Sequence, residues 1–230
     1  LIEPVFIAPL FNTFTPLQHA ALRAGILAMA RRQGIAAHEV YQMDASRRSR
    51  AVNAYVNGVG PSQRIVLYDT LLAYFTPAET QCVMAHEMGH YVLRHIPWGI
   101  ALSVLGTLAG SFALFRLAHA ILRRWGGRLG VHDPAHPAAY PLLLALGLAL
   151  ALAATPVAAY ISRRMERQAD AFALRIHPDY DASISTYHKL ARLNVADEEP
   201  PRWAIWLAGS HPSLGERIRA VEAARQHRSE

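Results

Sequence analysis

Cysteine is nearly absent from this 230-residue chain, whose only cysteine is Cys82. A single cysteine excludes a disulfide within the chain and leaves the redox compartment undetermined. A basic stripe interleaved with aromatic residues is also missing, because the 23 lysine and arginine residues are scattered along the sequence. We therefore expect no nucleic-acid partner, and the net charge of +6 favours anionic lipid headgroups instead.

The chain also lacks an initiator methionine. It starts at Leu1 inside an apolar run that extends to Phe11. We interpret it as part of a longer protein, so the lack of a signal peptide carries no information about location. Hydrophobic residues make up 52% of the chain, yet charges of both signs are present. We interpret this combination as a chain in which apolar and charged residues are segregated, with one soluble part and one part embedded in lipid.

Two long segments contain no charged residue. Residues 98–115 are uncharged, with an apolar pattern that extends to about residue 122, and residues 138–162 form a second uncharged run. A helix needs about 20 apolar residues to cross a bilayer. We therefore predict a transmembrane helical hairpin. A buried hairpin in a soluble protein is the alternative, although soluble helices rarely run so far without a charge.

The most informative motif is the sequence His-Glu-Met-Gly-His at 86–90, which follows the helix-start signal Thr-Pro-Ala-Glu at 76–79. Residues four apart lie on one face of a helix, so His86 and His90 can point two imidazoles at one metal ion. Glu87 lies about 100° further round, where it could take a proton from a bound water. The pattern predicts a zinc site, the alternative being two core histidines beside a surface glutamate.

A third ligand is expected just after the second apolar run. Glu166 and Asp170 share one helical face, and two like charges at that spacing disfavour a helix unless a cation or an arginine holds them. We predict Glu166 as a zinc ligand and Asp170 as the group that orients a histidine or binds an arginine. A solvated acidic face is the alternative. A metzincin would need histidine at 96, where Ile96 stands, and His95 is one residue out of register.

Three further residues could belong to this site. His211 precedes a predicted helix start, where it could donate a hydrogen bond to an oxyanion, and Arg217 could pair with Asp170. Cys82 lies one turn before His86 and is a conceivable fourth ligand. A small buried residue is the more common reading, because catalytic zinc usually keeps its fourth position for water. Gly89, inside the motif, would let another backbone approach closely.

A small sheet is expected before the metal helix. The strand candidates alternate or are β-branched, and they are residues 38–43, 54–57 and 64–68, with a turn at 57–61. Upstream, Thr15 and Pro16 predict the start of an amphipathic helix that stops at Gly34. An edge strand beside a protease site can bind an extended peptide. Asn53, Ala54 and Tyr55 are candidates for that edge, and a plain structural strand is equally plausible.

Six motifs, taken in order, make the chain resemble the CAAX prenyl protease 1 family of integral-membrane zinc endopeptidases. They lie at residues 7–17, 53–58, 64–71, 86–90, 166–170 and 210–218. The resemblance implies that further transmembrane helices precede Leu1 and complete a helical barrel around a large chamber. It also implies Glu166 as ligand, residues 53–55 at the substrate edge, and His211 with Arg217 assisting the transition state.

These observations together predict a mainly α fold with a small three-stranded sheet and a two-helix transmembrane hairpin. The expected divisions are residues 1–97, 98–162 and 163–230. We expect one Zn²⁺ per chain and a peptide or protein substrate that is lipidated or membrane-associated. Without a lysine-rich tail or a retrieval signal, the bacterial inner membrane is favoured over the endoplasmic reticulum. A heat-shock-type quality-control zinc protease and a non-catalytic membrane scaffold with structural zinc are the alternatives.

Overall fold

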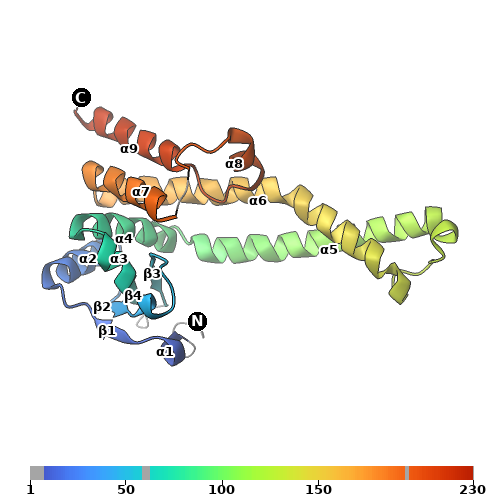
Figure 1. Ribbon diagram of the computed structural model, residues 1–230, viewed down its shortest axis with the longest axis horizontal. Coiled ribbons are helices and arrows are strands. Elements are labelled where there is room, and N and C mark those ends of the chain that lie inside the picture. The colour runs from blue at the N-terminus through green and yellow to red at the C-terminus, as the bar shows by residue number, and fades with distance from the viewer. Residues whose placement is uncertain (1–7, 59–62, 195–196, 230) are drawn as a thin grey trace. The chain divides into compact units, whose positions relative to one another are not determined.

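The computed structural model describes residues 8–58, 63–194 and 197–229, so the first seven residues of the apolar run and most of the predicted turn at 57–61 lie outside the described residues. The chain divides into two compact units, and Figure 1 labels the helices and strands that are described below. The first unit comprises Leu1–His95, Arg164–Pro201 and Pro212–Glu230, and the second comprises Ile96–Arg163 and Arg202–His211. The segment 202–211 therefore groups with the apolar helices.

The first unit contains a mixed four-stranded sheet of order β1-β2-β4-β3. Its strands are β1 (Phe14–Pro16), β2 (Val40–Met43), β3 (Ala54–Asn57) and β4 (Arg64–Tyr68). β2 and β4 are parallel, and the two outer strands pair antiparallel with them. The three predicted strands are confirmed, and β1 is an additional one.

The prediction that a helix starts at Thr15 and Pro16 was wrong. Both residues lie in β1, where Thr15 pairs with Gln42 of β2, and proline is tolerated because an outer strand can lack one donor. The helix that follows, α2 (Ala20–Arg32), is capped by His19, whose Nδ1 accepts from the backbone N–H of Leu22 at 3.2 Å. A Thr-Pro pair fits a helix start and an edge strand equally well.

The core of this unit lies between α2, the sheet and α4 (Pro77–Val92). Ile26 of α2, Ile65 of β4 and Met84 and Met88 of α4 are fully buried there. Met88 lies about 200° round the helix from His86, so the apolar side of α4 packs into the core while the histidine side stays away from it. Burying a methionine contributes about 1.5–3 kcal/mol, which fixes the rotation of α4.

The first unit contains further helices. They are α1 (Ala8–Phe11), α3 (Asp69–Tyr74), α7 (Tyr180–Asn194) and α9 (Leu214–Ser229), with a short 3-10 turn at Ala45–Arg47. α7 packs against α9 through a second cluster that contains Tyr187, Ile218 and Val221.

The second unit is built from two long helices and a short one. They are α5 (His95–Leu129), α6 (Tyr140–Ile176) and α8 (Arg202–Ala208), with a 3-10 turn at Pro137–Ala139. α5 and α6 contain the two predicted spans and are long and apolar enough to cross a membrane. Beyond Arg163, α6 belongs to the first unit.

Arg163 is the first charged residue after the uncharged run of α6, and it is buried. Its Nη1 donates to the carbonyl oxygens of Ile205 (2.6 Å) and Gly209 (2.7 Å). The Ile205 carbonyl also accepts from the Gly209 N–H at 3.0 Å, and a cation near the last carbonyls of a short helix interacts favourably with them. α8 is thereby attached to α6 at the end of the predicted span.

Candidate metal centre

The helix that carries the His-Glu-Met-Gly-His motif begins where its capping signal predicts. The hydroxyl of Thr76 accepts from the Glu79 N–H at 3.3 Å, and the Glu79 carboxylate accepts from the Thr76 N–H at 2.7 Å. Pro77 occupies the first turn, where its missing N–H is not needed. This reciprocal capping box fixes the register of α4 and hence the face on which its histidines lie.

His86 and His90 of α4 meet Glu166 of α6 in one cluster. The two Nε2 atoms lie 3.0 Å apart, and the Glu166 carboxylate oxygens lie 3.4 Å from each of them. The three ligand atoms fall within 4.8 Å of one another, and no other group of at least three metal-ligating side chains occurs among the described residues. Two imidazole nitrogens and a carboxylate suit a divalent transition-metal ion, so this donor set fits a metal site.

Gly89 is the reason that α6 can come this close to α4. A methyl group built at Gly89 would lie 3.1 Å from both the Cα and the carbonyl oxygen of Ala169. The expected close approach of another backbone is therefore confirmed, and the approaching backbone belongs to α6. Ala169 lies between Glu166 and Asp170 in the sequence, so the contact sets the distance from α4 to both carboxylates.

Asp170 binds the ring nitrogen of His86 that faces away from Glu166. Its Oδ1 lies 2.9 Å from His86 Nδ1, and Arg217 of α9 donates from Nε to Oδ2 (2.8 Å) and from Nη2 to Oδ1 (2.5 Å). A histidine or an arginine is predicted beside Asp170, and both residue types contact its carboxylate. Tyr187 of α7, which sequence reasoning missed, donates to the same carboxylate at 3.1 Å and lies under the Arg217 guanidinium.

Burial and neighbouring charges set the pKa values in this cluster. Burial by itself lowers the pKa of His86, but hydrogen bonds to Asp170 and Glu166 outweigh it and raise that pKa to about 9. Burial lowers the pKa of His90 to about 4, and the charge of His86 acts in the same direction. The two pKa shifts are opposed because carboxylates that hydrogen-bond to His86 outweigh its burial, whereas burial is the largest influence on His90. Burial raises the pKa of Glu87 to about 6.

Comparison with known proteins agrees with this geometry. Residues 16–225 match the peptidase family M48. The chain belongs to this family. A Bacillus subtilis protein named "Uncharacterized metalloprotease YhfN" is 37% identical over 224 residues, which are 96% of this chain and 52% of that protein. An Oryza sativa "CAAX prenyl protease 1 homolog" is 33% identical over 228 residues, 97% of this chain and 52% of that protein.

The M48 fold is also shared with a solved structure. The crystal structure of S. mikatae Ste24p matches with a TM-score of 0.76 at 33% identity, over 96% of this chain and 53% of that chain. The mainly α fold with a small sheet and the resemblance to CAAX prenyl protease 1 are thereby confirmed. The chain spans about half the length of the relatives that it matches.

Cys82 lies on the metal-binding helix of this M48 chain but outside the ligand cluster. Its Sγ lies 3.8 Å from the carbonyl oxygen of Asp179 and 3.5 Å from Ser183 Oγ. Burial raises the pKa of the thiol to about 11, which keeps it neutral. The structure supports the reading of Cys82 as a small buried residue between α4 and α7.

The predicted substrate edge lies at β3. Ala54 and Tyr55 are in this outermost strand, which contacts α4, and Asn53 precedes it. The Asn53 carbonyl accepts from the N–H of Tyr68 at 3.0 Å. The other candidate for contact with the reaction, His211, belongs to the second unit, where its Nδ1 lies 2.8 Å from Ser210 Oγ. The roles assigned to these residues stay predictions.

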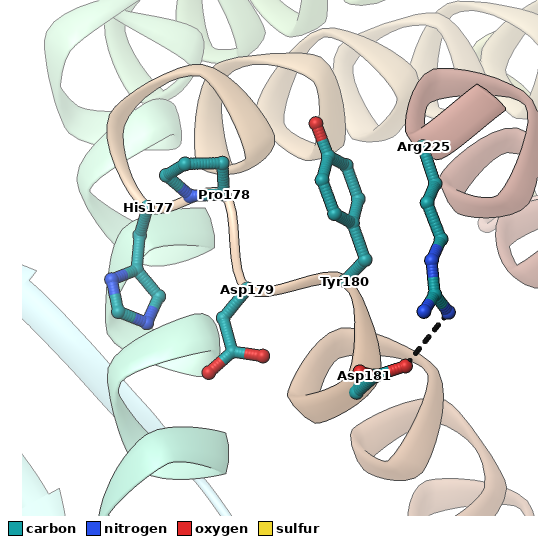
Figure 2. Close-up of a pocket in the computed structure, with 6 residues that line it drawn as sticks. All are labelled: His177, Pro178, Asp179, Tyr180, Asp181 and Arg225. Carbon is teal, nitrogen blue, oxygen red and sulfur yellow. Dashed lines mark hydrogen bonds and ion pairs between the residues drawn. The ribbon is translucent and has the colours of Figure 1, made fainter. Parts of the chain in front are cut away.

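A separate cavity of about 380 Å³ lies at the junction of α6, α7 and α9. It is lined by His177, Pro178, Asp179, Tyr180, Asp181 and Arg225, which Figure 2 shows. Two of these lining residues, Arg225 and Asp181, form an ion pair of 2.8 Å. Its lining contains none of the three clustered ligands, so the cavity is not the metal site.

Proposed function

We propose that this chain is the catalytic part of a membrane-embedded zinc metalloendopeptidase, with one zinc ion held by His86, His90 and Glu166. The observation that carries the proposal is the convergence of these three donors from α4 and α6. Membership of the M48 family supports the same assignment. Three protein ligands are the usual set of catalytic zinc, whereas structural zinc normally has four.

Zinc bound there would act as a Lewis acid and lower the pKa of a water molecule toward about 7. Glu87 follows His86 directly on α4, and its charge interacts with those of His86, Glu166 and Arg217. In the proposed reaction Glu87 accepts the proton of the attacking water and passes it to the leaving amine. It does not need to bind the metal for this role.

Asp170 and Arg217 are proposed to hold His86 in place. Asp170 accepts the Nδ1–H of His86, which leaves Nε2 free for the metal. Two nitrogens of Arg217 donate hydrogen bonds to Asp170, and these contacts hold the carboxylate of Asp170 in position. Its Nη2 also lies 3.4 Å from His86 Nδ1. We propose that Arg217 and His211 assist the transition state by stabilising negative charge on the substrate oxyanion.

The proposed substrate is an extended peptide that pairs with the edge of β3 at residues 53–55. The contact between β3 and α4 supports this placement, because it brings a strand edge beside the metal helix. Relatives named CAAX prenyl protease 1 favour a lipidated, membrane-associated substrate. The Bacillus subtilis relative is named only as a metalloprotease, without a substrate class, and a quality-control protease is the second candidate.

We further propose that α5 and α6 cross the bacterial inner membrane. Both are long and apolar enough for a span, and their exposed faces carry large hydrophobic side chains such as Leu105, Phe112 and Leu148. Apolar faces of this extent are rarely exposed to water in soluble proteins and usually mark a membrane or protein contact. The Bacillus subtilis relative is consistent with a bacterial location.

Replacing Glu87 with Gln tests the proposed reaction. Hydrolysis by the full chain should fall by a factor of about 10²–10⁴, because the amide cannot accept the proton. Zinc content should stay at one ion per chain, since the ligands are untouched. His86→Ala is the matched comparison, which should lose both zinc and hydrolysis. Retained hydrolysis in Glu87→Gln would remove Glu87 as the base.

The substrate class needs a separate measurement. The wild-type chain in lipid vesicles is offered farnesylated CAAX peptides and unfolded membrane proteins in parallel. Cleavage of the first group alone would favour the CAAX-type enzyme, and cleavage of the second the quality-control protease. Bound zinc without cleavage of either group, together with a fourth protein ligand on the ion, would point to the non-catalytic scaffold.

A further inference from the structure

His95 lies directly behind one of the proposed zinc ligands. Its Nδ1 is 2.9 Å from the Nδ1 of His90, and its side chain is buried, with the residue only 7% exposed. The rings of the two histidines meet edge to face with their centroids 5.0 Å apart. In the sequence, His95 lies one residue before the position of the third metzincin ligand. In the structure it contacts His90 and is not one of the three clustered metal-ligating side chains.

A tight turn between α4 and α5 brings His95 back onto α4. The N–H of Leu93 donates to the carbonyl of Gly89, and the N–H of Arg94 donates to that of Tyr91. Arg94 then adopts a φ of 58°, in the left-handed region where residues other than glycine are strained by about 1–2 kcal/mol. His95 is the next residue and begins α5, so this left-handed step turns its ring toward His90.

The direction of the hydrogen bond follows from the ligand geometry. The Nε2 of His90 faces His86 Nε2 (3.0 Å) and the Glu166 carboxylate (3.4 Å), so Nε2 is the ligand atom and must be unprotonated when it binds a metal. The proton of a neutral His90 ring is then on Nδ1, and His95 Nδ1 must accept it. His95 in turn carries its own proton on Nε2.

A third side chain matches this arrangement. The Oε1 of Gln168 lies 3.2 Å from His95 Nε2, and an amide oxygen can only accept. The hydrogen bonds therefore run in one direction, from His90 through His95 to Gln168. Gln168 is exposed, so water competes for its place and its contribution is smaller than that of the buried His95.

We infer that His95 is a positioning residue for the metal ligand His90, because it accepts the His90 Nδ1–H and holds the His90 Nε2 lone pair toward the metal. It does for His90 what Asp170 does for His86, with a neutral acceptor in place of a carboxylate. Groups that bind the second ring nitrogen of a ligand histidine fix its tautomer and orientation. The inference rests on the proposed metal site.

The test measures the zinc dissociation constant of the full chain in detergent by competition with a chelator. His95→Leu, which keeps bulk but removes the acceptor, should raise this constant by about 10–100-fold. His95→Asn keeps an acceptor oxygen at the δ1 position and should restore it to within about threefold of the wild type. Gln168→Ala should have a smaller effect than His95→Leu.

His188→Leu is the matched control, because it makes the same change at an exposed histidine of α7 that is bonded to Glu198. It should leave the zinc dissociation constant unchanged. Replacing zinc with Co²⁺ gives a second readout, since a misoriented His90 would change the visible absorption spectrum in His95→Leu but not in His95→Asn.

Two outcomes would overturn the inference. Zinc binding by His95→Leu at wild-type strength would show that His90 needs no partner on Nδ1. Equal weakening in His95→Leu and His95→Asn would show that His95 acts through packing alone. Failure of the wild type to bind zinc would instead refute the proposed metal site, so the two failures are distinguishable.

Discussion

The two histidines of the metal centre are held by chemically different partners. His86 donates to Asp170, a carboxylate that also binds Arg217 and Tyr187, whereas His90 contacts the imidazole of His95. A carboxylate partner makes a ligand histidine more basic than a neutral acceptor does. In the proposed site His86 would therefore be the stronger donor, and the network behind it connects α4 to α6, α7 and α9.

At the scale of single residues, Gly89→Ala should weaken the metal site without touching a ligand. The added methyl would meet backbone atoms of Ala169 at 3.1 Å, and backbone cannot rotate away. The overpacking costs about 1–3 kcal/mol, more than the ~1 kcal/mol that alanine gains over glycine in a helix. We expect a lower unfolding temperature and zinc affinity reduced by at least about tenfold, measured by chelator competition.

Gly127→Ala is the control for this substitution. Gly127 lies in α5 with nothing within 4 Å of the added methyl. Alanine there should leave zinc affinity unchanged and cost no stability. If Gly89→Ala behaved like Gly127→Ala, the close contact between α4 and α6 would not govern the position of Glu166.

At the scale of elements, α4 is anchored at its start by a buried acid. Glu79 is 3% exposed and closes the capping box, and it also binds two side chains of α7. Its carboxylate accepts from Ser185 at 2.6 Å and from Lys189 at 2.7 Å. The helix that carries His86 and His90 is thus tied to α7 about two turns before the first histidine and about three turns before the second.

Glu79→Gln should lower stability in a pH-dependent way. Burial by itself raises the pKa of Glu79, but bonds from Lys189, Ser185 and Thr76 outweigh it and hold that pKa below its usual 4.5. A carboxyl whose pKa is lowered by folding stabilises the protein above its unfolded pKa and loses this contribution as pH falls through the folded value. The variant should therefore be about 1–3 kcal/mol less stable at pH 7, and the difference should shrink below pH ~4.5.

This is measured as the apparent unfolding temperature of both chains in detergent from pH 7 to pH 3. Asp181→Asn serves as control, because Asp181 is an exposed acid whose ion pair with Arg225 contributes little. A difference between Glu79→Gln and the wild type that stays constant over this range would exclude the ionised carboxylate as its source.

The elements also show which features a sequence can predict. α4 and β4 follow from local signals, a capping box for the first and a β-branched run for the second. β1 does not, because the pairing of Thr15 with Gln42 joins distant segments and the Thr-Pro signal is ambiguous. The short helices α3 and α8 contain too few residues to show a helical period.

In the whole molecule, the candidate metal site likewise has a part that local sequence patterns predict and a part that they do not. The clustering of His86, His90 and Glu166 could be predicted, because spacing by four places His86 with His90 and the like charges of Glu166 and Asp170 disfavour a helix without a counterion. The supporting groups could not. Tyr187 and His95 reach the site only through the packing of α7 and the left-handed turn before α5, and no short-range pattern marks either event.

The two compact units of the fold should respond differently to removal of the metal. The proposed ligands come from α4 and from the part of α6 beyond Arg163, and both segments belong to the first unit. A ligand present at 100 times its dissociation constant stabilises the state that binds it by about 2.7 kcal/mol. Chelation should therefore loosen the first unit, while the apolar helices of the second should keep their protection in the bilayer.

Hydrogen exchange of the full chain in lipid vesicles, with and without chelator, measures this difference element by element. Amides of α4 and of residues 164–176 should exchange faster after chelation, and those of residues 98–122 and 140–162 should not change. Glu87→Gln keeps all three ligands and should respond like the wild type. His86→Ala should show the fast pattern before chelator is added. Equal acceleration in both units would contradict the confinement of the metal to the first, because loss of the ion would then release the whole chain rather than the segments that bind it.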